Sequence, residues 1–246
     1  MSAPITLAGA RVLVTGGTRG IGRAMAEALF RAGAKVAVCA RSRADVAEAE
    51  QTLGVVGFAC DLTDPIAVAE LAAGLEARLG GIDVVVHNAG IQREVRLTEG
   101  VDAAEVELEI DLNLLAPMRL TAALMPLLRR SERAAIVHVT SILALAPKQV
   151  APVYCATKAG LRSWTKAIRA QLAPEGIRVV ELVPPLVKTA MTEGRDDGAV
   201  PPEVVAEALV RGLARGRDEI RVGKAKVFAA LHRLSPGLAE QMMIGR

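Results

Sequence analysis

The sequence contains few aromatic residues and few of the residues that bind metals or form disulfides. Its 246 residues include one tyrosine, one tryptophan and three phenylalanines, together 2% of the chain. Three cysteines and three histidines are present, and none has a C-x-x-C or H-x-x-x-H spacing, which argues against a zinc site. The isolated Cys39, Cys60 and Cys155 lie in apolar runs. We predict that they are small buried residues in a reducing compartment.

Signals for export, membrane insertion and nucleic-acid binding are also lacking. The first residues, MSAPITLAGARVLV, show neither the basic nor the apolar region of a signal peptide. The uncharged run 134–147 is too short to span a bilayer. The 30 basic and 27 acidic residues are scattered, whereas a nucleic-acid-binding protein clusters its basic residues. We therefore expect a cytoplasmic protein with no membrane span and no nucleic-acid partner.

What the sequence does contain is a regular alternation of apolar runs with helical patterns. The apolar runs predict strands at 11–16, 35–40, 55–59, 83–88, 134–141, 177–183 and 219–222. Helices are predicted at 21–31, 43–53, 64–79, 103–130, 153–172 and 202–215, the fourth adjusted at Pro117 and Pro126. Strands that are apolar throughout indicate a parallel sheet buried on both faces. The prediction is an α/β fold with one domain over residues 1–246, a Rossmann-type doubly wound parallel sheet with helices on both faces.

A glycine-rich turn, TGGTRGIG, separates the first predicted strand from the first helix. A helix N-terminus binds phosphate through free N–H groups and its dipole, and glycines let the backbone approach the ligand. Gly16, Gly20 and Gly22 have the spacing G-x-x-x-G-x-G, and the alternative interpretation is a turn without a ligand. The position between a strand and a helix favours a dinucleotide site.

The end of the second predicted strand indicates which dinucleotide is bound. An NAD site has a carboxylate there for the ribose, whereas an NADP site has arginine for the additional phosphate. Here Ala40 is followed by Arg41, Ser42 and Arg43, and Arg19 lies within the glycine turn. Arg41 and Arg19, each taken alone, would be interpreted as solvated surface charges. Together, and with no acid present, they predict NADP(H).

Six motifs in this order resemble the short-chain dehydrogenase/reductase family over nearly the whole chain. They are TGGTRGIG, CDLTD (60–64), HNAG (87–90), DLNLLAP (111–117), VHVTS (137–141) and YCATK (154–158). The sequence departs from the family at His87, where an asparagine is usual, and at Pro185, where a glycine is usual. Because proline fixes φ and lacks an N–H, the loop near the nicotinamide is expected to differ in shape. Further segments resemble a bacterial subgroup labelled DltE-like, a label that fixes no substrate.

The resemblance implies the site residues. The catalytic residues would be Asn113, Ser141, Tyr154 and Lys158. The cofactor would be bound by Gly16, Thr18, Arg19, Gly20, Ile21, Gly22, Arg41, Ser42, Asp61, Leu62, Asn88, Ala89, Gly90, Tyr154, Lys158, Pro184, Val187 and Thr189. The resemblance implies that Lys158 binds the ribose, that Ser141 orients the substrate oxygen, and that Asn113 holds a water in a proton relay. A homodimer or homotetramer is also expected.

The chemistry centres on the only tyrosine. A free tyrosine has a pKa near 10, too high for efficient acid–base catalysis at neutral pH. Lys158 follows Tyr154 by four residues, so on a helix both lie on one face, and the ammonium is expected to lower the tyrosine pKa. The structural alternatives are a half-buried tyrosine, a strand-end turn residue at Ser141 and a helix-kink hydrogen bond at Asn113.

Other features have less specific interpretations. His87 is expected at a strand end, His138 packed in a strand, and Trp164 in the core or at a subunit interface. We interpret Arg162, Lys166 and Arg169 as a solvated face, with docking of an acidic carrier protein as the alternative.

The substrate pocket is expected to be mostly apolar. It would be lined by residues 91–93, 142–145 and 190–200, with Gln149 and Pro185. The tail 224–243, amphipathic up to Ser235, could cap the pocket, pack at a subunit interface or contact a membrane, and we favour packing.

The predicted function is reversible carbonyl reduction with NADP(H) and a small carbonyl or alcohol substrate. The alternatives are a 3-oxoacyl-thioester reductase and a catalytically idle NADP-binding regulatory protein.

Overall fold

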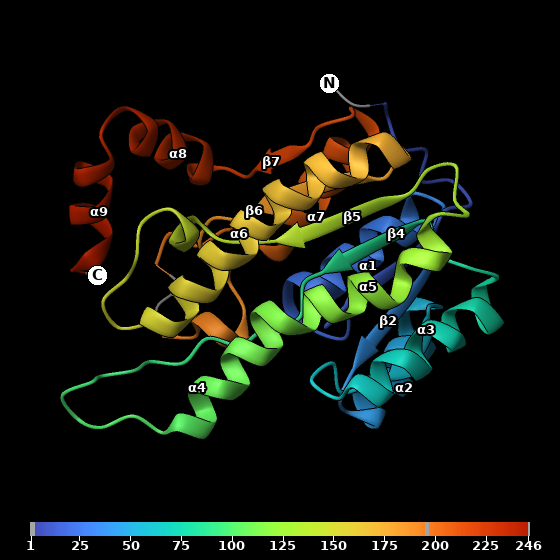
Figure 1. The fold of residues 1–246 in the computed structure, drawn as a ribbon, viewed down its shortest axis with the longest axis horizontal. Helices are drawn as coiled ribbons and strands as arrows, with labels where there is room; N and C mark the ends of the chain where they lie inside the picture. Colours follow the sequence, from blue (N-terminus) through green and yellow to red (C-terminus); the bar gives the residue numbers. More distant parts are fainter. Residues whose placement is uncertain (1–2, 195–196, 246) are drawn as a thin grey trace.

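A parallel sheet of seven strands runs through the molecule, and helices cover both of its faces (Figure 1). The computed structural model describes residues 3–194 and 197–245. The sheet order is β3–β2–β1–β4–β5–β6–β7, so the chain builds outward from β1 in both directions. The strands are β1 Arg11–Thr15, β2 Lys35–Ala40, β3 Val56–Ala59, β4 Val84–His87, β5 Ala135–Val139, β6 Arg178–Val183 and β7 Glu219–Arg221. The predicted doubly wound α/β fold is confirmed.

The described helices are α1 Gly20–Arg31, α2 Arg43–Leu53, α3 Pro65–Leu79, α4 Ala103–Ile110, α5 Ala116–Leu128, α6 Pro152–Leu172, α7 Pro202–Ala214, α8 Lys224–Leu234 and α9 Pro236–Ile244. Six of them form two layers, one on each face of the sheet. One layer contains α1, α2 and α7, and the other contains α3, α5 and α6. In β1, Val12 and Val14 face the first layer and Leu13 the second, and all three are fully buried. This two-sided burial is why the strands lack a polar face.

The predicted helix over 103–130 is interrupted in its first half. Between α4 and α5, residues Asp111–Leu115 form a π-helical turn, in which the Ala116 N–H donates to the carbonyl of Asp111, five residues back. Pro117 has no N–H for the carbonyl of Asn113, so regular α-helical bonding cannot continue there. Pro126, by contrast, is accommodated inside α5.

The C-terminal tail forms two helices, α8 and α9, which lie beyond the carboxyl ends of the central strands (Figure 1). The amphipathic helix α8 ends at Leu234, in agreement with the predicted limit at Ser235, and Pro236 then occupies the first turn of α9, where a missing N–H costs nothing. The backbone N–H of Gln149 donates to the carbonyl of Ile244 (3.2 Å), and α8 contacts the turn Ile142–Ala144. The tail therefore packs over the 142–150 segment.

Two expectations from composition can be compared with the structure. Cys39, Cys60 and Cys155 are free and buried, as predicted, and burial raises the pKa of all three thiols. Within residues 3–194 and 197–245, no helix combines the length and the hydrophobicity needed to cross a bilayer.

Candidate active site

The turn between β1 and α1 has a backbone that only glycine allows. Gly16 has φ +62°, in the left-handed region, and a Cβ on Gly22 would lie 2.1 Å from the Gly16 carbonyl oxygen. Helix α1 begins at Gly20, and in the described structure its N-cap, Arg19, makes no side-chain cap hydrogen bond. Free N–H groups in a close-fitting glycine turn suit a phosphate. Of the other predicted residues here, Thr18 is buried and Ile21 packs against the core.

The carboxyl ends of β1 and β4 meet at the point where the strand order reverses. Thr15 Oγ1 accepts hydrogen bonds from the backbone N–H groups of Asn88 (2.9 Å) and Ala89 (3.0 Å). The Asn88 side-chain amide donates to the Thr15 carbonyl (3.0 Å). The Gly90 backbone packs closely against Asn113, since a Cβ on Gly90 would lie 2.9 Å from Asn113 Oδ1. Thr15 was not among the predicted site residues, although it begins the glycine motif.

Among the predicted cofactor-binding residues, Arg41 lies close enough to Asp61 for its charge to act on the Asp61 pKa. Burial acts to raise the pKa of Asp61, but hydrogen bonds from the Thr63 amide (3.0 Å) and hydroxyl (2.7 Å) and the charge of Arg41 lower it overall. Arg41 is exposed and Leu62 is buried. Ser42 caps α2 by accepting from the Asp45 N–H (3.2 Å), so its hydroxyl already has a structural role.

The segment after β6 returns to the glycine turn. Pro184 and Val187 are buried, and Val187 forms a bridge with Val200. The Thr189 methyl carbon lies 3.4 Å from the position of a Cβ on Gly20, so this predicted contact residue borders the phosphate cradle. Pro185 is half-buried and lies near Gly223, with its Cγ 3.9 Å from the position of a Cβ there.

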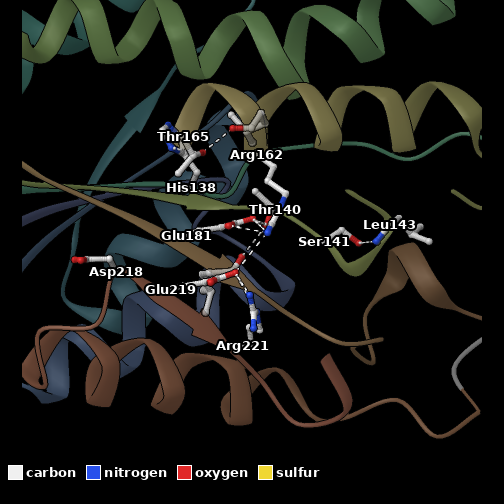
Figure 2. A network of polar contacts seen from close by, with 12 residues as sticks. His138, Thr140, Ser141, Leu143, Arg162, Thr165, Glu181, Asp218, Glu219 and Arg221 are labelled. Atoms are coloured by element: carbon white, nitrogen blue, oxygen red, sulfur yellow. Dashed lines mark hydrogen bonds and ion pairs between the residues drawn. The ribbon is translucent and has the colours of Figure 1, made fainter. Parts of the chain in front are cut away.

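Ser141, Tyr154 and Lys158 are brought together beyond the end of β5. Tyr154 lies in the first turn of α6, and Lys158 lies one turn later, with its Nζ 5.5 Å from the Tyr154 ring centre. The Ser141 hydroxyl lies near enough to the Tyr154 hydroxyl to act on its pKa. Ser141 Oγ also accepts from the Leu143 N–H (3.1 Å), which fixes the turn after β5 (Figure 2).

The pKa of Tyr154 shifts in the direction opposite to the prediction. Burial raises it to about 12, against the lowering effect of the nearby Ser141 hydroxyl. The ammonium of buried Lys158 donates to the Val139 carbonyl (3.0 Å) rather than to the phenol oxygen, and burial lowers the Lys158 pKa to about 8. In this arrangement the i, i+4 spacing brings the two side chains close without lowering the tyrosine pKa.

Asn113 joins the segment after β4 to α6. It is fully buried in the π-helical turn, its amide donates to the Ile91 carbonyl (2.8 Å), and its oxygen accepts from the Ile91 N–H (2.9 Å). Its amide also donates to the Thr157 hydroxyl (3.3 Å), one residue before Lys158. Asn113 therefore fixes one wall of the site.

A buried ion-pair network holds α6 against the sheet (Figure 2). Arg162 donates to both oxygens of Glu181 (2.7 and 2.8 Å), the Thr140 hydroxyl donates to the same carboxylate (2.8 Å), and Glu219 lies 3.5 Å from Arg162. Arg169 donates to the Val179 carbonyl (2.7 Å). The predicted solvated face is therefore wrong for Arg162 and Arg169, because both bind groups of the sheet, and only Lys166 of that set is exposed.

Two histidines pack beneath the site. His87 and His138 are register partners on β4 and β5, and their rings stack with centres 4.9 Å apart. Both are buried, and each has a ring nitrogen 3.0 Å from a threonine hydroxyl, that of Thr121 or Thr165. Burial lowers the pKa of both, that of His87 to about 3. Their predicted positions at a strand end and in a packed strand are confirmed. Trp164 packs against the core, as one of its two interpretations required.

The structure adds a buried carboxylate that was not among the predicted site residues. Glu109 is fully buried on α4 and lines a cavity of about 400 Å³ next to the predicted pocket residue Arg93. This cavity is polar, and it shares only Arg93 with the described residues of the apolar substrate pocket expected from the sequence. The signal in the sequence was the spacing, because Glu109 precedes Asn113 by four residues. Among the residues described, no group of three or more histidine, cysteine and acidic side chains is placed to bind a metal.

Comparison with known proteins agrees with this geometry. A family model described as short chain dehydrogenase matches residues 10–199. The uncharacterized oxidoreductase DltE of Bacillus subtilis is 38% identical over 217 residues, covering 85% of this chain and 86% of the relative. The 3-oxoacyl-[acyl-carrier-protein] reductase FabG of Salmonella typhimurium is 33% identical over 187 residues, covering 75% and 76%.

A solved structure extends the similarity to the whole fold. A short chain dehydrogenase from Burkholderia cenocepacia, in complex with NADP, superposes with a TM-score of 0.88 at 25% identity. The match covers 98% of this chain and 100% of that one.

Proposed function

This chain belongs to the short-chain dehydrogenase family, and we propose on that basis that it is an NADP(H)-dependent oxidoreductase interconverting a carbonyl compound and an alcohol. The observation that carries the proposal is the grouping of Ser141, Tyr154 and Lys158 beyond the end of β5. A protein that only binds a nucleotide has no use for this set. The alternative of an idle regulatory protein is therefore not favoured.

The cofactor proposal rests on the turn and the charges around it. The glycine turn has the close backbone approach that a pyrophosphate requires, and Arg41 and Arg19 provide positive charge where the additional phosphate of NADP would lie. Thr189 and the Asn88–Gly90 segment border the same crevice. When bound, the nicotinamide supplies or accepts the hydride. The NADP complex of the Burkholderia cenocepacia relative supports this choice.

The proton chemistry is assigned to Tyr154. With a pKa of about 12, its hydroxyl retains its proton at neutral pH and can donate it to the oxygen of a carbonyl undergoing reduction. Ser141, whose hydroxyl lies near that of Tyr154, is placed to bind the same substrate oxygen. Lys158 stabilises the phenolate once the proton has left, because its pKa of about 8 leaves the ammonium largely protonated at pH 7. We assign Asn113 to the proton path between Lys158 and solvent.

The main test is removal of the Tyr154 hydroxyl. We expect Tyr154→Phe to abolish NADPH oxidation with every ketone that the wild type reduces, by a factor of about 100 or more in kcat, because general acid catalysis is lost. NADPH binding, measured by calorimetry, should persist. Undiminished turnover by the variant would remove Tyr154 from this role.

Arg41 tests the cofactor preference. We expect Arg41→Asp to move the ratio of kcat/KM for NADPH over NADH toward NADH, by about tenfold or more, because a carboxylate repels the additional phosphate and accepts from a ribose hydroxyl. Arg43→Asp, on the same exposed turn, makes the same charge change at the first residue of α2 and serves as the control. An unchanged preference in the Arg41 variant would exclude its assigned role.

A second candidate, reduction of 3-oxoacyl thioesters, is favoured by the 33% identity to FabG. A short 3-oxoacyl thioester analogue and a free ketone of the same length distinguish the two functions. Turnover of the thioester at a rate matching or exceeding that of the ketone would favour this candidate. A single functional domain, a cytoplasmic location and assembly as a homodimer or homotetramer also remain parts of the proposal.

A further inference from the structure

A polar cavity of about 400 Å³ lies between α4 and the long loop that precedes it. Its lining contains five acidic residues and two arginines. Both arginines are paired within the lining, Arg93 with Glu105 (3.0 Å) and Arg96 with Glu99 (3.7 Å). The charge of the cavity is therefore set by its acidic residues.

Glu109 lies at the buried end of this cavity and is 0% exposed. Neither of its carboxylate oxygens forms a hydrogen bond with any residue that the structure describes. The backbone amide and the charge of Arg93 are near enough to act on its pKa, but burial dominates and raises that pKa. A buried carboxylate without hydrogen bonds requires an explanation, because no interaction within the described structure offsets the free energy of its desolvation.

The catalytic residues lie within the electrostatic reach of Glu109. Its charge acts to raise the pKa of both Tyr154 and Lys158. It also lies four residues before Asn113, which contacts the residue preceding Lys158. A substrate that is bound by its carbonyl at Tyr154 and Ser141 and is long enough to extend to α4 would place another of its groups at Glu109.

We propose that Glu109 binds a positively charged amino group of the carbonyl substrate, so that the substrate class is amino ketones or amino aldehydes. An ammonium group supplies three N–H donors and a charge opposite to that of the lining, which satisfies both open carboxylate oxygens. The proposal rests on the proposed function for the reacting end of the substrate. Glu109 itself selects the substrate and takes no part in proton transfer.

The test compares two aliphatic methyl ketones of equal length, one ending in an ammonium group and the other in a methyl group. We expect the wild type to prefer the amino ketone in kcat/KM by about tenfold or more, as a charge-assisted hydrogen bond allows. Glu109→Gln should lose this preference. Glu107→Gln, an exposed position on the same helix with the same charge change, should keep it. Equal preference in the wild type and the Glu109 variant would overturn the proposal.

Direct binding separates failure of the site from failure of the proposed function. An aliphatic amine and the corresponding alcohol, neither of them reducible, are titrated into the full-length protein by calorimetry. We expect the amine to bind the wild type about tenfold more tightly than it binds Glu109→Gln. Equal binding, or an alcohol that binds as well as the amine, would overturn the amino-group site even if ketones are reduced. If the amine binds as expected and no ketone is reduced, only the proposed function fails.

Discussion

Two glutamates are equally buried in this protein, and their surroundings are opposite. Glu181 on β6 is 1% exposed and accepts hydrogen bonds from Arg162 and Thr140, whereas Glu109 on α4 is 0% exposed and has none among the described residues. A fully bonded buried carboxylate connects structural elements, and an open one retains its capacity to bind. The first therefore belongs to the scaffold that positions α6, and the second to the polar cavity that α4 lines.

The largest effect is expected when the bonded carboxylate loses its cation. Arg162→Ala leaves the Glu181 charge buried without its main partner, which should lower the free energy of unfolding by about 3–5 kcal/mol. Urea denaturation measures this loss. Lys166→Ala, at an exposed position on the same helix, should change stability by less than about 0.5 kcal/mol.

A double variant distinguishes an uncompensated charge from lost packing. In Arg162→Met with Glu181→Leu no buried charge remains at this pair, and we expect most of the lost stability to return, since well-packed apolar residues often match a buried ion pair. Continued instability of the double variant would mean that the geometry of the network, rather than its charge balance, holds α6.

The histidine pair beside this scaffold sets a pH dependence. His87 and His138 are buried and neutral, with pKa values lowered from 6.5, so below pH 6.5 only the unfolded chain takes up their protons. Their contribution to stability is therefore complete above pH 6.5 and is lost as the pH falls. Protonation of these two groups in the unfolded chain should lower the free energy of unfolding by about 3 kcal/mol between pH 6.5 and 5. His87→Asn should reduce this loss by about half, as measured by urea denaturation at both pH values. An identical pH slope in the variant would contradict the assignment.

Much of the fold was predictable because each element carries its own local signal. The apolar strands and the glycine turn depend on neighbours in the sequence, and so does the placement of Tyr154 in the first turn of a helix. Pro117 also signalled the disturbance at Asn113, although not its π-helical form. The end of α8 before Ser235 also followed from the sequence, whereas α9, in whose first turn Pro236 lies, was not predicted.

The electrostatics of the site were less predictable, because they depend on partners far away in the sequence. Spacing placed Lys158 beside Tyr154, but the ammonium bonds the Val139 carbonyl on another element, and burial determines both pKa values. Arg162 was misassigned for the same reason, since Glu181 is 19 residues away in sequence and its position depends on the packing of α6 against β6. The open state of Glu109 depends on the path of the loop after β4.

Substitution by leucine compares the two glutamates directly, and the smallest expected effect is the one at Glu109. Glu181→Leu should destabilise the protein, because it leaves the largely buried Arg162 without its main partner. Glu109→Leu should instead raise the free energy of unfolding by about 1–2 kcal/mol at pH 7, since it removes an unsatisfied buried group. Because the folded-state pKa of Glu109 is raised above 4.5, its burial lowers the free energy of unfolding least below that pH, where the carboxyl is protonated in both states. The gain from leucine should therefore be larger at pH 7 than at pH 4.5, as measured by urea denaturation at each pH. If Glu109→Leu destabilises the protein as Glu181→Leu does, Glu109 also belongs to the scaffold, and the distinction between the two carboxylates is lost.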